Sequence, residues 1–131
     1  MAHEVYWLKP GSVLYAGFYG HQTSETFAAG MDAQLVELDQ VDHPVVVVAD
    51  WSEATAVEKN AITSQKGHRA YGHPMVARVV IVGIGQHEAF QNEINNTRAR
   101  GQSHARYFDT LDEAKAYLKQ MLEDDSPETG S

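Results

Sequence analysis

The stretch Pro44-Val-Val-Val-Val-Ala-Asp-Trp-Ser52 sets the fold class of this chain of 131 residues. Its β-branched residues follow one another without polar alternation, a pattern typical of a strand that is buried on both faces. Such strands occur mostly in parallel sheets that helices cover, and ligands tend to bind where the strands end. We therefore expect an α/β domain with Asp50, Trp51 and Ser52 at the end of a central strand.

Further strand signals lie on both sides of this stretch. Residues 76–82 form a second apolar run, and residues 105–108 form a short third one. Near the start of the chain, residues 5–8 and 13–19 have strand character, and the Pro-Gly pair between them suits the centre of a type II turn. The chain is thus predicted to begin with a β-hairpin and to continue into a mostly parallel sheet.

Four helices are expected to cover this sheet. Thr23 can cap the first, which is expected to end near Asp42, and its apolar residues recur at three- and four-residue spacing. The others are expected over residues 53–66, in the segment that Gly101 ends, and after a capping box at residues 110–113. The apolar stripe of the first helix consists of Phe27, Met31, Leu35, Leu38 and Val41.

The predicted element order is ββαβαβαβα in one domain of residues 1–123, followed by a disordered acidic tail over residues 124–131. A net charge of −8 argues against a nucleic-acid binder, because displacing counterions needs a dominant positive field. The chain has no cysteine, so it has neither disulfides nor a thiolate metal site. It also lacks a signal-peptide pattern and an apolar run long enough for a membrane span, so we expect a cytoplasmic protein.

The N-terminal hairpin, the buried strand that closes on Asp50-Trp-Ser52, and the closing segment Phe108-Asp-Thr-Leu-Asp-Glu-Ala-Lys-Ala-Tyr-Leu118 resemble the STAS family. This family comprises the anti-sigma-factor antagonist domains and their bacterial SEC14-like relatives. The resemblance implies a regulatory domain that works by binding rather than by catalysis.

Regulatory members of the family carry a phosphorylatable serine about eight residues after the acid that ends the central strand. The comparable stretch here is Val57-Glu-Lys-Asn-Ala61, in which Glu58 keeps an acid but Lys59 or Asn60 stands at the acceptor position. Neither side chain can take a phosphate from a serine kinase, so the resemblance does not extend to the usual switch. Alternative acceptors nearby are Ser52, Thr55, Thr63 and Ser64.

The corner formed by Asp50, Trp51 and Ser52 admits two interpretations. As a binding site, it would offer a ligand an acceptor, a stacking face and a hydroxyl. As a structural corner, Ser52 would cap the next helix, Asp50 would accept its amides, and Trp51 would pack over a loop. The turn Gly83-Ile-Gly85 could likewise present amides to an anion, or serve only as a strand-to-helix turn.

Two basic loops are expected to meet, because all helix-to-strand connections of a parallel sheet lie at the same end of the sheet. Asp39 and Asp42, in a third connection, could instead pair with these loops within the chain. If they do not, the loops offer a positive surface to an anionic ligand or an acidic partner. The first loop carries Lys66, His68, Arg69, Tyr71 and His73, and the second carries Arg98 and Arg100. Because His68 and His73 lie five residues apart with no third ligand nearby, we expect no metal, and we expect no other cofactor.

We therefore expect a non-catalytic, cytoplasmic STAS-like domain for protein interaction or regulation, which binds a protein partner or itself. The alternative is a SEC14-like domain that binds a small ligand or lipid. A homodimer is slightly favoured over a monomer, through the first hairpin strand at a sheet edge, with either Val5 and Trp7 or Tyr6 and Leu8 facing outward. No Gly-x-Ser-x-Gly elbow is present, so an enzyme is not expected.

Overall fold

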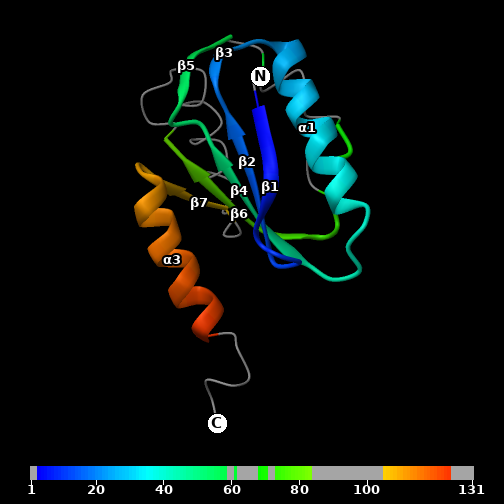
Figure 1. Ribbon diagram of the computed structural model, residues 1–131, viewed down its shortest axis with the longest axis vertical. Coiled ribbons are helices and arrows are strands. Elements are labelled where there is room, and N and C mark those ends of the chain that lie inside the picture. The colour runs from blue at the N-terminus through cyan, green and yellow to red at the C-terminus, as the bar shows by residue number, and fades with distance from the viewer. Residues whose placement is uncertain (1–2, 59–60, 62–67, 71–72, 84–104, 125–131) are drawn as a thin grey trace.

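The structure is a computed structural model that describes residues 3–58, 61, 68–70, 73–83 and 105–124 (Figure 1). Its main feature is a five-stranded sheet with the order β1-β2-β4-β6-β7. Strands β2, β4, β6 and β7 run parallel, and β1 pairs antiparallel with β2. The strands of this sheet are β1 (His3–Lys9), β2 (Val13–Phe18), β4 (Val45–Asp50), β6 (Val76–Val82) and β7 (Ala105–Phe108). The predicted α/β fold, with an N-terminal hairpin and a mostly parallel sheet, is confirmed.

The hairpin turn forms as its sequence predicts. Gly11 has a φ of +71°, which a type II turn requires at its third position, and the Ser12 amide donates to the Lys9 carbonyl at 2.9 Å.

No helix in the described part of the chain is long and apolar enough to span a membrane. The helices expected beyond Asn60 and before Gly101, and the tail beyond Asp124, lie outside the described residues.

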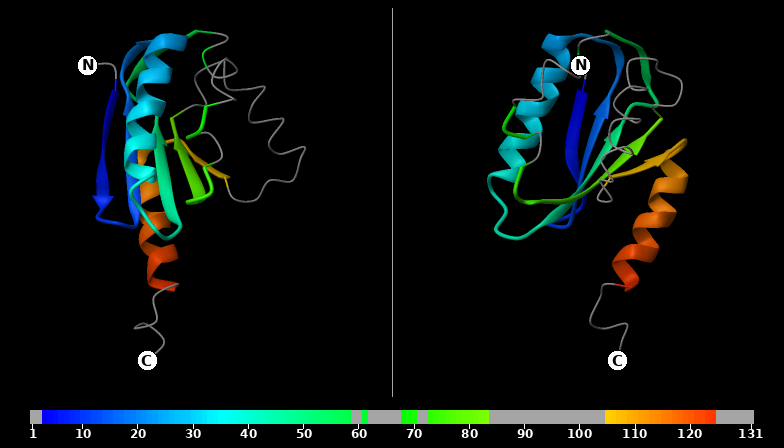
Figure 2. Two further views of the ribbon diagram at one scale, coloured as in Figure 1. Left: turned by 90° about the vertical axis from the view of Figure 1, so that its right-hand side faces the viewer. Right: turned by 180° about the vertical axis from the view of Figure 1, so that it is seen from behind.

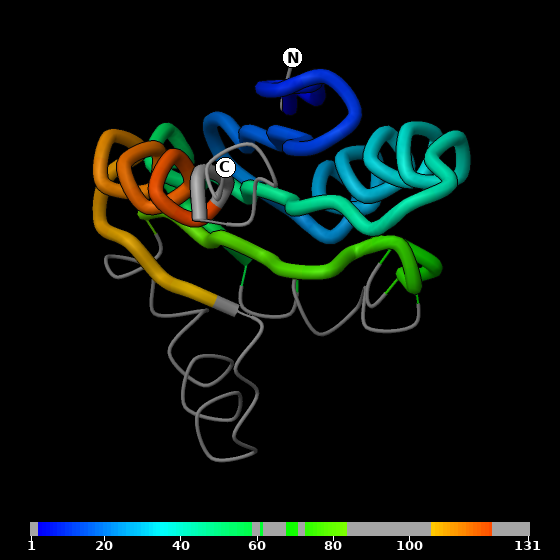
Figure 3. Tube along the Cα trace, turned by 90° about the horizontal axis from the view of Figure 1, so that it is seen from below, coloured from blue at the N-terminus to red at the C-terminus, as the bar shows by residue number. Residues whose placement is uncertain are grey.

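The two helices within the described residues cover opposite faces of the sheet (Figure 3). Helix α1 (Ser24–Leu38) packs on the face formed by alternate residues such as Leu14 and Val47. Helix α3 (Leu111–Asp124) packs on the face that carries Val48 and Val80. Since β2 and the first four residues of β4 are buried throughout, the central strands are covered on both sides, as their unbroken apolar sequence predicts.

Both described helices begin at their predicted caps. The Thr26 amide donates to the Thr23 hydroxyl at 3.2 Å, and the Glu113 amide donates to the Thr110 hydroxyl at the same distance. Helix α1 ends at Leu38, four residues before the expected end, because the chain must already turn back towards β4. The last apolar residue of the predicted stripe, Val41, packs against the core from the loop.

The helix expected over residues 53–66 is wrong in its first part. Residues 54–57 form strand β5 (Ala54–Val57), which pairs parallel with β3 (Gly20–Gln22) in a second, two-stranded sheet. The Gly20 amide donates to the Glu53 carbonyl, and the Glu58 amide donates to the Gln22 carbonyl. Backbone pairing with a segment over 30 residues away along the chain thus overrides the helix propensity of the local sequence.

Close packing joins α1 to β2. A Cβ atom at Gly30, in the middle of α1, would lie only 2.5 Å from the ring of Phe18. That ring is itself fixed, because it stacks on Trp51 with a centroid distance of 4.3 Å and meets Phe27 edge-on at 5.4 Å. The helix can therefore approach the sheet this closely only with glycine at position 30.

We predict that Gly30→Ala destabilises the protein although alanine is the better helix former. The propensity gain is about 1 kcal/mol, whereas forcing a methyl group into a filled core costs about 1–3 kcal/mol. Urea denaturation monitored by circular dichroism should show a lower midpoint. Adding Phe18→Leu, which removes the clashing ring atoms, should make the Gly30→Ala change less costly than in the wild type; a Gly30→Ala variant that is more stable than the wild type contradicts the packing.

His43 links the hairpin turn to the start of β4. One ring nitrogen, Nδ1, lies 2.9 Å from Asp42 Oδ1, and Nε2 lies 2.5 Å from the Gly11 carbonyl oxygen. Because both neighbours are acceptors, the doubly protonated ring is favoured, and the Asp42 hydrogen bond followed by the Gly11 contact raises the pKa of His43. The same contact lowers the pKa of Asp42.

We predict that a histidine pKa above the usual value of about 6.5 belongs to His43, measured by NMR titration of the ring protons. A raised pKa means that the stabilisation from His43 is fully present below the unfolded pKa and disappears as the pH rises through the folded pKa. The lowered Asp42 pKa means that the contribution is also lost as the pH falls through the folded pKa of that acid. Asp42→Asn should bring the His43 pKa down; an unchanged value in that variant would contradict the contact.

Candidate functional site

Asp50 ends β4 at the carboxyl edge of the sheet, where α/β folds place their ligands. Its side chain is buried, with 4% of the residue exposed. Oδ2 accepts a hydrogen bond of 2.7 Å from the Tyr15 hydroxyl, and Oδ1 accepts from the amide and the hydroxyl of Ser52 at 3.0 and 2.6 Å. The carboxylate is thus held by donors from its own turn and from the neighbouring strand.

The other members of this corner take structural positions. Trp51 is 2% exposed and lies against Phe18 and Phe27 in the core, so its ring is not offered to a ligand. Ser52 is exposed, and the segment after it is β5 rather than the helix that it was expected to cap. Of the structural interpretation, the amide bond to Asp50 is present, whereas Ser52 caps no helix and Trp51 packs in the core rather than over a loop.

Gly83, the first residue of the predicted anion turn, has a φ of +75°. A Cβ atom there would lie 2.8 Å from the backbone of Ser52, so the position needs glycine for close packing. Its amide donates to the Phe108 carbonyl at 2.9 Å. Gly83 thus has a conformational role, and the remainder of the turn lies outside the described residues.

The side chains of Tyr15, in β2, and of Tyr19, just after this strand, lie close to Gly17. The Tyr15 hydroxyl binds Asp50, and the Tyr19 hydroxyl donates to Glu4 Oε2 at 2.6 Å. Burial, and then the bonded carboxylate, raise the pKa of Tyr15 far above its ordinary range and that of Tyr19 to about 12. Both phenols therefore stay protonated donors at neutral pH. No sequence motif marks this group, because the strand register alone brings its members together.

Glu58 is the acid that the STAS resemblance singled out, and its side chain contacts the first turn of α1. Its Oε1 accepts a hydrogen bond of 3.2 Å from the Ser24 amide in the first turn of that helix. A carboxylate in this position balances the positive end of the helix dipole. Lys59, the residue at the expected phosphate acceptor position, lies outside the described residues.

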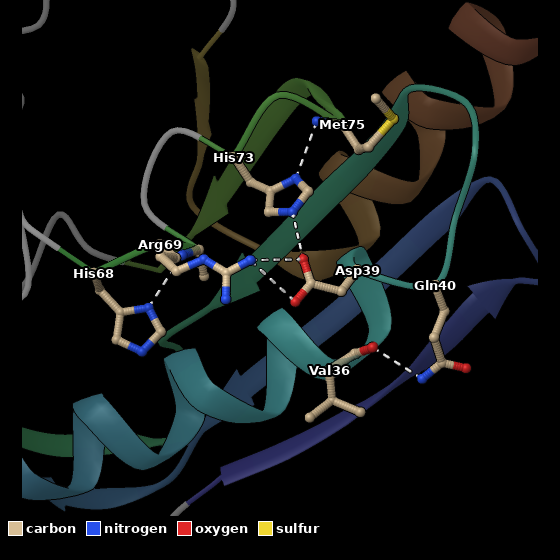
Figure 4. A network of polar contacts seen from close by, with 8 residues as sticks. Val36, Asp39, Gln40, His68, Arg69, His73 and Met75 are labelled. Atoms are coloured by element: carbon tan, nitrogen blue, oxygen red, sulfur yellow. Dashed lines mark hydrogen bonds and ion pairs between the residues drawn. The ribbon is translucent and has the colours of Figure 1, made fainter.

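Two histidines attach the first basic loop to α1 and to its C-cap residue, and Figure 4 shows the contact that His73 makes with that C-cap, Asp39. His68 Nε2 lies 2.6 Å from Asp32 Oδ1, and His73 Nε2 lies 3.0 Å from Asp39 Oδ1. In each ring Nδ1 accepts a backbone amide two residues further on, at 3.0 Å. Since Nδ1 is an acceptor in both rings, Nε2 carries the proton and donates it to the carboxylate.

Arg69 completes this contact. Its Nη2 lies 3.4 Å from both carboxylate oxygens of Asp39 (Figure 4). The described basic side chains of the loop, His68, Arg69 and His73, are therefore bonded to acids of the same chain, one of the two arrangements that the sequence allowed. Asp42, the other acid expected to take part, contacts His43 instead.

The remaining predicted residues of the basic surface, Lys66, Tyr71, Arg98 and Arg100, lie outside the described residues, so the meeting of the two loops stays a prediction. Within residues 3–58, 61, 68–70, 73–83 and 105–124, no group of three or more histidine, aspartate or glutamate side chains could hold a metal ion.

We predict that Tyr15→Phe destabilises the protein by about 1–3 kcal/mol, because it leaves the buried Asp50 carboxylate without one of its donors. Tyr19→Phe removes the same atom from a tyrosine that binds the exposed Glu4, and should cost about 0.5 kcal/mol or less. Urea denaturation of the two variants gives the comparison. Equal losses would mean that water replaces the Tyr15 hydroxyl at Asp50, and that the corner is open to solvent.

The comparisons with known proteins place this geometry in a fold. No family model matches the chain, and no curated protein matches it. A similar solved structure is that of an uncharacterized protein of the DUF3478 family with a SpoIIAA-like fold, from Shewanella loihica PV-4. It is 17% identical in sequence, covers 89% of this chain and 92% of its own, and superposes with a TM-score of 0.60. At this identity the likeness concerns the fold alone, and it confirms the STAS-like architecture: the chain has a SpoIIAA-like fold.

Proposed function

We propose that this chain is a non-catalytic interaction domain that associates with a second copy of itself through the edge strand β1. The observation that carries the proposal is the position of β1, which ends the sheet on one side (Figure 2, left). This strand also carries an exposed aromatic residue, Tyr6. An edge strand exposes a row of unpaired backbone amides and carbonyls, which a strand of another chain can complete.

The two faces of β1 have different neighbours. Val5 and Trp7 pack against the core beneath α1, and the Trp7 indole donates to Glu37 of that helix at 3.0 Å. On the other face Tyr6 is 42% exposed, with its ring 4.8 Å from that of Tyr15. The sequence left two pairs as candidates for the face of β1 that points away from α1. Tyr6 and Leu8, rather than Val5 and Trp7, are therefore the pair on that face.

Antiparallel pairing of two β1 strands about Tyr6 would join two sheets across a twofold axis. Because residues directly opposite each other share a face, this register sets the two Tyr6 side chains side by side and Val5 opposite Trp7. Aromatic and β-branched cross-strand pairs of this kind stabilise sheets. Glu4 and Lys9 flank the contact, and Glu4 is already bonded to Tyr19 within its own chain.

A binding role is supported by how the polar groups of the carboxyl edge are used. Tyr15 donates to one oxygen of Asp50 and Ser52 donates to the other, so both carboxylate oxygens are used in contacts within the chain. The proposal requires no phosphorylation, which agrees with Lys59 or Asn60 at the acceptor position. A cytoplasmic setting is part of the proposal and fits a sequence without cysteine.

We predict that the wild-type protein sediments as a dimer at tens of micromolar and that Tyr6→Glu sediments as a monomer, because it brings two like charges together at the axis. Val36→Glu is the matched control: Val36 is also apolar and 59% exposed, but lies on α1. It should leave the dimer intact. Analytical ultracentrifugation measures all three.

A monomeric wild type, or equal loss of the dimer in both variants, would overturn the proposed interface. Native mass spectrometry of the same samples tests the alternative function. A co-purified small molecule or lipid on a monomeric chain would favour a SEC14-like ligand-binding domain.

A further inference from the structure

Two arginines lie near the other edge of the sheet, beneath α3. Val80 of β6 pairs with Arg106 of β7, and Arg78 is two residues before Val80. Since alternate residues of a strand share a face, Arg78 and Arg106 point to the same side as diagonal neighbours. That side is the one covered by α3.

Both arginines contact one tyrosine of α3. Arg78 Nη1 donates to the Tyr117 hydroxyl oxygen and lies 3.2 Å from the sulfur of Met121. The guanidinium carbon of Arg106 lies 5.8 Å from the centroid of the Tyr117 ring, which is the geometry of a cation–π contact. One side chain thus holds two guanidinium groups, one at its hydroxyl and one over its face.

Among the side chains that the structure describes, which leave out those of residues 122–124, neither arginine has a carboxylate partner. The third described arginine, Arg69, does have one, since its guanidinium faces both oxygens of Asp39. The contrast is informative in a chain with 18 acidic residues against ten lysines and arginines, where acids to pair with are plentiful. At Arg78 and Arg106 the contacts are a hydroxyl, a thioether and an aromatic face, none of which neutralises charge.

Among the side chains that the structure describes, no anionic acceptor contacts the donors of this group. The Tyr117 oxygen accepts from Arg78, so its own proton remains available to donate. Arg78 uses Nη1 in its described contacts, which leaves the other N–H groups of the fork. Two like charges beside one ring repel each other, and an anion placed between them would relieve that repulsion.

We propose that Arg78, Arg106 and Tyr117 form a binding site for the phosphate group of a small molecule. A carboxylate is satisfied by a single guanidinium fork, whereas a tetrahedral phosphate offers oxygens to two forks that approach from different directions and to a hydroxyl as well. The site lies at the β7 side of the sheet, opposite the β1 edge, so it is independent of the proposed self-association.

The test is a titration of the full chain with inorganic phosphate, followed through backbone amide NMR shifts, against sodium chloride at matched ionic strength. Saturable shifts at residues 78, 106 and 117 with phosphate alone are expected. Arg78→Gln and Arg106→Gln should each weaken binding by about tenfold or more, the effect of losing one charge-assisted hydrogen bond. Arg69→Gln, which removes an arginine that is already paired, should leave the affinity unchanged.

Two conservative variants keep the test decisive if a glutamine variant unfolds. Arg78→Lys preserves the charge but not the planar fork, and Tyr117→Phe preserves the ring but not the hydroxyl; both should weaken phosphate binding. A parallel titration with glycerol 3-phosphate distinguishes a phosphate ester from free phosphate as the natural ligand. Tighter binding than inorganic phosphate indicates the ester, and weaker binding indicates the free ion. Equal shifts in chloride and phosphate, or affinity unchanged in the arginine and tyrosine variants, would overturn the proposal.

Discussion

The structure depends on the burial of β4 on both faces. Its alternate valines belong to two different cores, Val45 and Val47 to the one beneath α1 and Val46 and Val48 to the one beneath α3. A strand in this position must have a parallel or antiparallel neighbour on each side, and here these are β2 and β6. Because apolar side chains fill both faces of β4, this strand can carry polar chemistry only at its end, where Asp50 lies.

The carboxyl end of β4 illustrates how the polar groups adapt to this burial. A buried carboxylate is costly unless donors surround it. The register sets Gly17 beside Asp50, and the missing side chain at position 17 leaves space for the phenols on either side of it. A Cβ atom there would come within 2.9 Å of the hydroxyl oxygens of both Tyr15 and Tyr19. The glycine, the two tyrosines and the acid therefore form one structural unit.

The sequence predicts those parts of the fold that short-range patterns determine. The unbroken β-branched runs 45–48 and 79–82 identify β4 and β6, and cap residues identify the starts of α1 and α3. The pattern fails at β5, because Glu53, Ala54 and Ala56 favour a helix locally and only pairing with β3 makes the segment a strand. The same limit applies to the sites. Tyr15 and Asp50 lie 35 residues apart, and Arg78 and Tyr117 lie 39 apart, so only the register of the strands and the docking of α3 bring them together.

The arginines of this chain show why position in the fold, rather than residue type, decides availability for a ligand. Arg69 lies in the connection that leads into β6, at the amino end of the sheet. Helix α1 ends there too, and Arg69 pairs with Asp39, the residue that caps this helix end. Arg78 and Arg106 lie on the sheet surface beneath α3, whose facing side chains are Tyr117, Leu118 and Met121. Helix α3 carries Asp112 and Glu113 in its first turn, where they interact favourably with the helix dipole, and Glu123 and Asp124 at its end. None of the carboxylates whose side chains the structure describes contacts Arg78 or Arg106, and the proposed phosphate group would supply a negative charge to both.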